Sequence, residues 1–186
     1  MKEIQQSKKQ PHIIRKRILE QAIILASQRG ISGISIQNVA NGAGVTKGGV
    51  FHHFANKQIL IEEMMNEILY HLDLMIESTI QQDHIDYGQF TRAYIQSAFE
   101  SEIAGLVSPW SALAMTMITD TTFNIYWSKW FNHKLLQYSS TDDYPELAFI
   151  RLATDGLWLS WITNSFDKET CIKLKTDLIN RTYLTH

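Results

Sequence analysis

Cysteine, long apolar runs and secretion signals are scarce or absent in this chain of 186 residues. Its one cysteine, Cys171, cannot form an internal disulfide. The apolar runs are shorter than the roughly 20 residues that a membrane-spanning helix needs, and the first residues, MKEIQQSKKQ, lack the apolar stretch of a signal peptide. We therefore expect a cytoplasmic protein that does not contact a membrane.

Familiar catalytic and metal-binding patterns are also missing. The chain has no Gly-rich phosphate loop, no G-x-S-x-G turn and no H-E-x-x-H helix. His52 and His53 are adjacent, and neighbours on a helix point in different directions, whereas paired metal ligands on a helix need a spacing of four residues. We expect no enzyme activity, no cofactor and no metal site. An enzyme is the main alternative class, although no catalytic spacing supports it.

Signals for β-strands are weak, because no segment alternates apolar and polar residues between hairpin turns. The three prolines each stand where a helix could begin. Apolar residues instead recur every three or four positions, as they do in Ile14, Ile18, Ala22 and Leu25 before Gly30. A longer stripe runs from Leu60 to Thr79. The spacing predicts an all-α fold of about nine helices.

The charge is unevenly distributed, although the net charge is only −2. Residues 1–57 carry nine Lys or Arg and two acids, a net +7, and residues 58–186 carry a net −9. The basic residues include Lys8, Lys9, Arg15, Lys16 and Arg17. A basic end beside an acidic remainder indicates a polyanionic partner for the basic end alone.

The segment SIQNVANGAGVTKGGVFHHF, residues 35–54, has the pattern of two short helices joined by a tight turn. Ser35 is placed to cap the first helix, Gly44 permits the reversal, and Thr46 is placed to cap the second. Two such helices cannot form a core alone, so we expect them to pack on the stripe from Ile14 to Leu25. The pattern predicts a helix-turn-helix whose second helix enters the major groove of DNA.

This segment, together with RILEQAIILASQRG before it and ANKQIL after it, resembles the TetR/AcrR family of transcriptional repressors. The resemblance covers about the first 65 residues. It implies that Ser35, Gln37 and Lys57 grip phosphates, and that the second helix of the motif faces the groove. The predicted DNA-binding residues are Ser35, Gln37, Thr46, Lys47, Gly48, Gly49, Phe51, His52, His53 and Lys57.

Two residues depart from the family pattern. Many members have tyrosine where Phe51 stands, and its hydroxyl contacts a phosphate, which Phe51 cannot do. Gly49 replaces a Thr, Ser or Ala that often contacts a base edge. Gly48 and Gly49 each weaken an isolated helix by about 1 kcal/mol relative to alanine. We hypothesise that this helix becomes fully ordered only on DNA.

The C-terminal half is dense in aromatic residues, and all five tryptophans lie between residues 110 and 161. Large rings and flexible methionines can line an adaptable apolar cavity, but ordinary core packing remains the alternative for each of them. The predicted effector-binding residues are Tyr94, Trp110, Met115, Phe123, Trp127, Trp158 and Trp161. Nearby acids, Glu100, Glu102, Asp120 and Asp155, could complement a cationic effector. For Asp155 we expect a structural pair with Arg151, one turn earlier.

We expect a flexible leader over residues 1–11, a helix-turn-helix domain over 12–57 and a ligand-binding and dimerisation domain over 58–186. The resemblance assigns the last two helices to a four-helix dimer interface, and two recognition helices about one DNA turn apart read a palindrome. The predicted function is a homodimeric repressor, released from double-stranded operator DNA by a small effector. A dimeric DNA-binding protein without effector and an activator remain alternatives.

Overall fold

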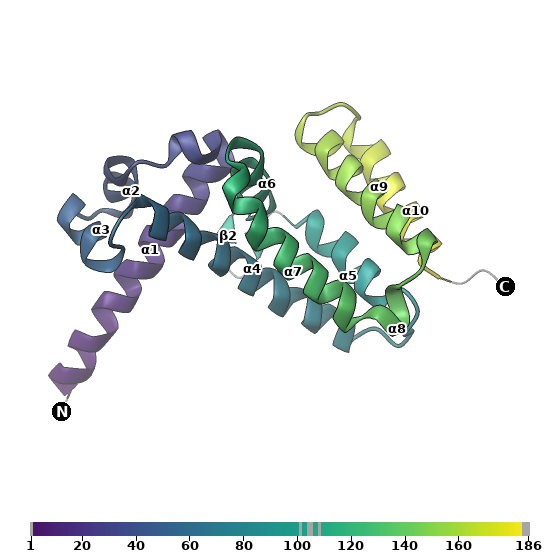
Figure 1. Cartoon of the computed structure of the whole chain (residues 1–186), viewed down its shortest axis with the longest axis horizontal. Helices are drawn as coiled ribbons and strands as arrows, with labels where there is room; N and C mark the ends of the chain where they lie inside the picture. The colour runs from purple at the N-terminus through teal and green to yellow at the C-terminus, as the bar shows by residue number, and fades with distance from the viewer. Residues whose placement is uncertain (1, 101, 104–105, 108, 184–186) are drawn as a thin grey trace. The chain divides into compact units, whose positions relative to one another are not determined.

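The computed structural model describes residues 2–100, 102–103, 106–107 and 109–183. This part of the chain forms ten α-helices and one 3-10 helix, η1 (Figure 1). The all-α prediction is confirmed, with one helix more than the rough number expected. In chain order the elements are α1 (Lys2–Gly33), α2 (Ile36–Ala43), α3 (Lys47–His53), α4 (Lys57–Gln81), α5 (Gln89–Ala98), β1 (Glu102–Ile103), β2 (Leu106–Val107), α6 (Pro109–Thr119), η1 (Thr121–Phe123), α7 (Asn124–Gln137), α8 (Ser139–Asp142), α9 (Pro145–Ile162) and α10 (Lys168–Arg181).

Two features depart from the sequence-based expectation. β1 and β2 form a two-residue antiparallel ladder, pairing Glu102 with Val107 and Ile103 with Leu106. The segment expected as a leader is helical from Lys2, with Pro11 inside α1. Proline usually kinks or ends a helix, because it lacks the backbone N–H and its ring meets the preceding turn, but α1 continues through Pro11.

The chain divides into two compact units: residues 1–71 with 101–128, and residues 72–100 with 129–186. The first unit contains the helix-turn-helix together with the first part of α4 and all of α6. It therefore extends beyond the domain boundary expected at residue 57, because α6 packs closely on α1. Its core is built from apolar residues on several helices, including Ile18, Ala22, Val39, Val50 and Phe54.

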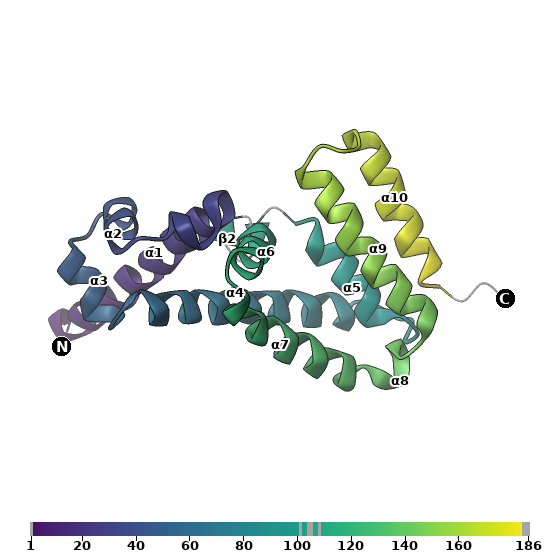
Figure 2. The same cartoon turned by 45° about the horizontal axis from the view of Figure 1, so that its top comes forward.

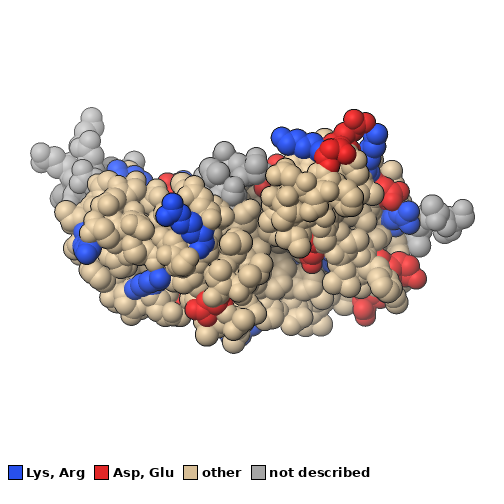
Figure 3. Space-filling view, turned by 90° about the horizontal axis from the view of Figure 1, so that it is seen from above, with Lys and Arg blue, Asp and Glu red and all other residues tan. Residues whose placement is uncertain are grey.

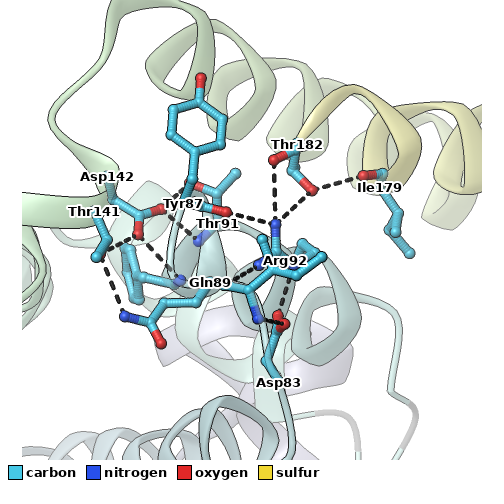
Figure 4. Close-up of polar contacts among 11 residues, drawn as sticks. Asp83, Tyr87, Gln89, Thr91, Arg92, Thr141, Asp142, Ile179 and Thr182 are labelled. Carbon is cyan, nitrogen blue, oxygen red and sulfur yellow. Dashed lines mark hydrogen bonds and ion pairs between the residues drawn. The ribbon is translucent and has the colours of Figure 1, made fainter. Parts of the chain in front are cut away.

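The second unit packs α5 against α9 and α10, which lie antiparallel to each other (Figure 2). Ile95, Leu147 and Ile150 form a buried cluster that Leu178 and Ile179 cover. The surroundings of the first turn of α5 are polar, however, because Arg92 is buried there with its hydrogen-bonding partners (Figure 4). The second unit is thus held together by apolar packing and by a buried polar network.

Candidate DNA interface and effector residues

The turn between α2 and α3 has the geometry that the sequence predicts. Ser35 Oγ accepts a hydrogen bond from the Asn38 amide at 3.0 Å and so caps α2. Gly44 ends the helix in the left-handed conformation with φ 65°, and the Val45 amide donates to the Ala40 carbonyl at 2.9 Å. These local contacts fix the direction in which α3 leaves the turn.

α3 presents one face to solvent and buries the other. Thr46 Oγ1 caps it by accepting from the Gly49 amide at 3.0 Å. Val50 and the following Phe54 are buried, whereas Lys47, Gly48, Phe51 and His52 are exposed. Gly49 and His53, which were predicted to face outward, are half-buried. A Cβ at Gly49 would lie 3.4 Å from Val45 Cβ, so this position faces the turn. The exposed face is therefore narrower than predicted.

The hydroxyl groups of Ser35 and Thr46, which cap the two helices, can still donate a hydrogen bond to another group. A hydroxyl is one donor and two acceptors, and capping uses only an acceptor position. Ser35 and Thr46 can therefore cap α2 and α3 and still donate to a phosphate oxygen. Gln37 is exposed in the first turn of α2, where its amide donates to Asn41 Oδ1 at 2.6 Å.

Several of the basic residues near the motif hold the domain together. Arg15 pairs with Glu63 at 2.5 Å, and Arg17 donates to the Ala43 carbonyl at 2.7 Å. Lys16 lies 3.7 Å from Glu20. The ammonium group of Lys57 donates to the Ile31 carbonyl at 3.2 Å. The predicted contact with a phosphate would therefore use one of its other N–H groups. The side chains of Lys8 and Lys9 lie outside the described residues.

Acidic residues are few on the face of the first unit that Figure 3 shows. On the face shown in Figure 3, lysines and arginines lie over the helices of this unit with little acid beside them, whereas acids and bases lie side by side over the second unit. Burial, the neighbouring His52 and then Arg15 lower the pKa of His53, which favours its neutral ring. Lys47 is the exposed lysine that α3 itself contributes.

Alanine at Gly48 is expected to stabilise the protein by about 1 kcal/mol, because alanine favours a helix over glycine by that amount. A Cβ at this position meets only Thr46 Oγ1, at 3.8 Å, so it fits without strain. Thermal unfolding followed by circular dichroism should show a melting temperature higher by about 2–4 °C. An unchanged or lower value would mean that α3 does not limit the stability of the domain.

Gly30 lies at a junction that leads into the helix-turn-helix. The regular part of α1 is interrupted there by a kink, with φ 59° and ψ −157°, a conformation that only glycine adopts readily. The next amide, that of Ile31, donates to Thr119 Oγ1 of α6 at 3.2 Å, and the Ile31 carbonyl accepts from Lys57 of α4. The short turn before Ser35 is thus fixed by α6 and by the start of α4.

The seven predicted effector residues fall in both units. Trp110, Met115, Phe123 and Trp127 belong to the first unit, where the rings of Trp110 and Trp127 meet edge to face at 5.6 Å. Tyr94, Trp158 and Trp161 belong to the second, where Trp161 contacts Phe99 at 6.0 Å. Two open hollows of about 790 and 390 Å³ on the α9–α10 surface are lined by none of the seven. The role of the seven residues in effector binding stays a prediction.

The expected pairing of Asp155 with Arg151 is wrong. Asp155 Oδ1 accepts a hydrogen bond of 2.5 Å from the Tyr94 hydroxyl. Burial and the charge of Asp155 raise the pKa of Tyr94 well above its usual range, so Tyr94 stays the donor. Arg151 instead donates to Thr91 Oγ1 at 2.7 Å and lies 3.8 Å from Asp142. Of the other acids, Asp120 caps η1 by accepting from the Thr122 amide at 3.0 Å.

Sequence reasoning missed Arg92, whose side chain is 2% exposed. Its Nε donates to Asp83 at 2.6 Å, and its Nη1 donates to the carbonyls of Tyr87 at 2.7 Å and Thr182 at 3.1 Å (Figure 4). Its Nη2 donates to the Ile85 carbonyl. Thr182 is 90 positions away in the chain, and no local pattern announces a contact over that separation.

The profiles of two known protein domains match this chain. Residues 18–64 match the profile of bacterial regulatory proteins of the tetR family, and residues 88–182 match the tetracyclin repressor-like C-terminal domain. The HTH-type transcriptional repressor KstR2 of Mycobacterium tuberculosis is 33% identical over 55 residues, which is 30% of this chain and 28% of the relative. The HTH-type transcriptional regulator AcrR of Shigella flexneri is 38% identical over 58 residues, 31% of this chain and 27% of that protein. These matches span less than a third of each relative.

Solved structures share the fold over nearly the whole length. A TetR-family transcriptional regulator from Streptomyces coelicolor aligns with TM-score 0.70 and 14% identity, over 97% of this chain and 91% of that one. The multidrug binding protein EbrR complexed with malachite green aligns with TM-score 0.63 and 19% identity, over 89% and 97%. No helix in the described residues is long and apolar enough to cross a membrane. The profile of the C-terminal domain alone covers more than half of the chain, which therefore belongs to the TetR/AcrR family of helix-turn-helix transcriptional regulators and not to a family of enzymes.

Proposed function

We propose that the protein is a cytoplasmic homodimeric repressor that binds palindromic operator DNA through α2 and α3 and leaves it when a small effector binds. The exposed face of α3, framed by the hydroxyls of Ser35 and Thr46, is the observation that carries this proposal. A helix of this kind fits the major groove of B-DNA, and Lys47 supplies positive charge to it. The basic surface of the first unit would add phosphate attraction.

Selection from a pool of random DNA duplexes tests DNA recognition and identifies the operator sequence in the same experiment. The full chain is expected to enrich a palindrome whose half-sites lie about one helical turn apart, because each subunit of a dimer presents one α3. The enriched sequence is called the selected operator below. Recovery of no common sequence would contradict specific DNA binding.

An unpartnered apolar surface on α9 and α10 supports the homodimer. Phe149 is 72% exposed and Leu152 67% exposed, and both lie on the outer face of α9. A Cβ at Gly156, on the same face, would meet nothing within 4 Å, so a partner helix could approach closely there. The surface continues onto α10 through Leu174, also exposed, which lines the same hollow as Gly156. An exposed apolar patch of this kind is typical of an interface.

Aspartate at Leu152 is expected to convert the dimer into monomers of 21.5 kDa, because the interface would bury an unpaired charge. Affinity for the selected operator should fall by about 100-fold or more, since each monomer binds only one half-site. Analytical ultracentrifugation measures the first effect and fluorescence anisotropy the second.

The control for this experiment is Leu136→Asp. Leu136 is 75% exposed on α7, outside the α9–α10 surface, so the same substitution there should leave both mass and affinity unchanged. Dimers of Leu152→Asp with wild-type operator affinity would contradict the proposed interface.

The aromatic residues of the C-terminal half support the effector part of the proposal. The structural relative EbrR is a multidrug binding protein seen in complex with malachite green, and we propose that this chain likewise binds a small aromatic or apolar effector, with acids available for a cationic one. Trp127→Ala and Trp158→Ala should weaken effector-induced release while sparing operator affinity. Loss of operator affinity together with the folded state would assign these tryptophans to the core instead.

A further inference from the structure

We propose that Phe51 reads the sequence of the operator by packing its ring against the 5-methyl group of one thymine in each half-site. This inference rests on the proposed function and names the base feature that α3 recognises. It assigns to an apolar side chain the specificity that polar contacts provide in most recognition helices.

Phe51 is unusual among the exposed residues of α3, a helix that the structure describes in full. Four of the seven residues are exposed, and Phe51 alone among them has a large apolar side chain, 49% exposed. The next phenylalanine, Phe54, is 1% exposed and belongs to the core. Half of the Phe51 side chain is thus in water, on the face of α3 proposed to bind DNA, where a partner outside the chain can cover it.

The surface beside Phe51 is open to a close approach. Gly48 lies one turn earlier on the same side of the helix, and a Cβ there would find only Thr46 Oγ1, at 3.8 Å. Because glycine has no side chain, nothing at position 48 separates the Phe51 ring from the edge of a base in the groove. Lys47 and Thr46, just before Gly48, offer polar groups to the neighbouring phosphates.

The chemistry of the major groove then identifies the partner. Base edges there display hydrogen-bond donors and acceptors, and the single apolar group among them is the 5-methyl of thymine. Phe51 has no hydroxyl and cannot use a phosphate or a polar edge. A ring pressed into the groove at this point therefore gains most from a thymine methyl, and each half-site should contain an A·T pair at a fixed position.

Deoxyuridine substitution tests this contact, because it removes the methyl and keeps the base pair. Each thymine of the selected operator is replaced in turn, symmetrically in both half-sites, and the dissociation constant is measured by fluorescence anisotropy with the full-length dimer. At one thymine per half-site we expect a loss of about fifteen-fold, or about four-fold for each buried methyl. Phe51→Ala should bind the unmodified operator about as weakly as wild type binds the substituted one, and should be insensitive to deoxyuridine at that position.

Two variants act as controls. Phe51→Tyr keeps the ring and should stay sensitive to deoxyuridine, and His52→Ala keeps Phe51 and should also stay sensitive. A selected operator with no position at which wild type loses affinity would overturn the inference, as would a loss that persists in Phe51→Ala. Failure to select any operator would overturn the proposed function itself, and this inference with it, so the two failures are distinguishable.

Discussion

Alanine at Gly30 is expected to destabilise the protein by about 3 kcal/mol or more, although it adds a single methyl group. The backbone conformation, φ 59° and ψ −157°, is one that only glycine adopts readily. The new Cβ would also lie 2.7 Å from both Cγ2 and Oγ1 of Thr119, and 3.1 Å from the Met115 carbonyl oxygen. Thermal unfolding should show a melting temperature lower by about 6–12 °C.

The same substitution should weaken binding to the selected operator, because the turn after Gly30 sets the start of α2. Removing the crowding side chain tests the cause: Gly30→Ala combined with Thr119→Ala should recover part of the lost stability, which a double-mutant cycle measures. Gly48→Ala is the matched control, since the same change there is expected to stabilise. A Gly30→Ala protein with the wild-type melting temperature would show that the junction relaxes at little cost and does not hold the motif in place.

Methionine at Arg92 is expected to reduce the free energy of unfolding by about 3–5 kcal/mol, the range found when one partner of a buried ion pair is removed. The substitution would leave Asp83, 17% exposed, without its guanidinium partner. It would also leave the carbonyls of Tyr87, Ile85 and Thr182 without this donor (Figure 4). Urea unfolding of the dimer at constant protein concentration measures the change.

Acid should reduce the difference between wild type and Arg92→Met. Partial burial alone would raise the pKa of Asp83, but the hydrogen bond and charge of Arg92, with the Ile85 amide, outweigh burial and lower this pKa. A carboxyl whose pKa is lowered on folding contributes stability above its unfolded pKa of about 3.9 and loses it as the pH falls through the folded value. The stability difference should therefore be complete at pH 7 and shrink below about pH 4.

Arg181→Met is the control for Arg92→Met. Arg181 lies at the end of α10 and pairs with Asp177 at 2.7 Å, but both side chains are more than half exposed. Its loss should change stability by less than about 1 kcal/mol at any pH. Equal effects of the two substitutions would contradict a special role for the buried network around Arg92.

The helix-turn-helix could be predicted from the sequence because its determinants are local. Ser35, Gly44 and Thr46 each act within four residues of their own position. The predicted orientation of Gly49 and His53 was less accurate, because the packing of α3 against the turn decides which edge of the helix is buried. The hypothesis that α3 becomes ordered only on DNA stays a prediction, which amide exchange with and without operator would test.

The C-terminal half could be predicted only as helical, because its side chains find partners far away in the chain. Asp155 had a candidate partner one turn earlier, but Tyr94, 61 positions away, binds it instead. Arg151 could have paired with Asp155 one turn later, but it donates a hydrogen bond to Thr91 and forms an ion pair with Asp142 instead. The aromatic composition likewise indicated a ligand-binding region, but composition does not tell which of the seven predicted residues belong to which unit.

Recognition through the exposed face of α3 is tested by the affinity of the dimer for its selected operator relative to a scrambled duplex of equal composition. Fluorescence anisotropy measures both affinities over a range of salt concentrations. We predict a preference of about 1,000-fold or more at physiological salt, the lower end of specific recognition, and loss of most of that preference in a variant with alanine at Lys47, Phe51 and His52. Equal affinities for the two duplexes, falling together as salt rises, would mean phosphate attraction alone and would contradict recognition through the exposed face of α3.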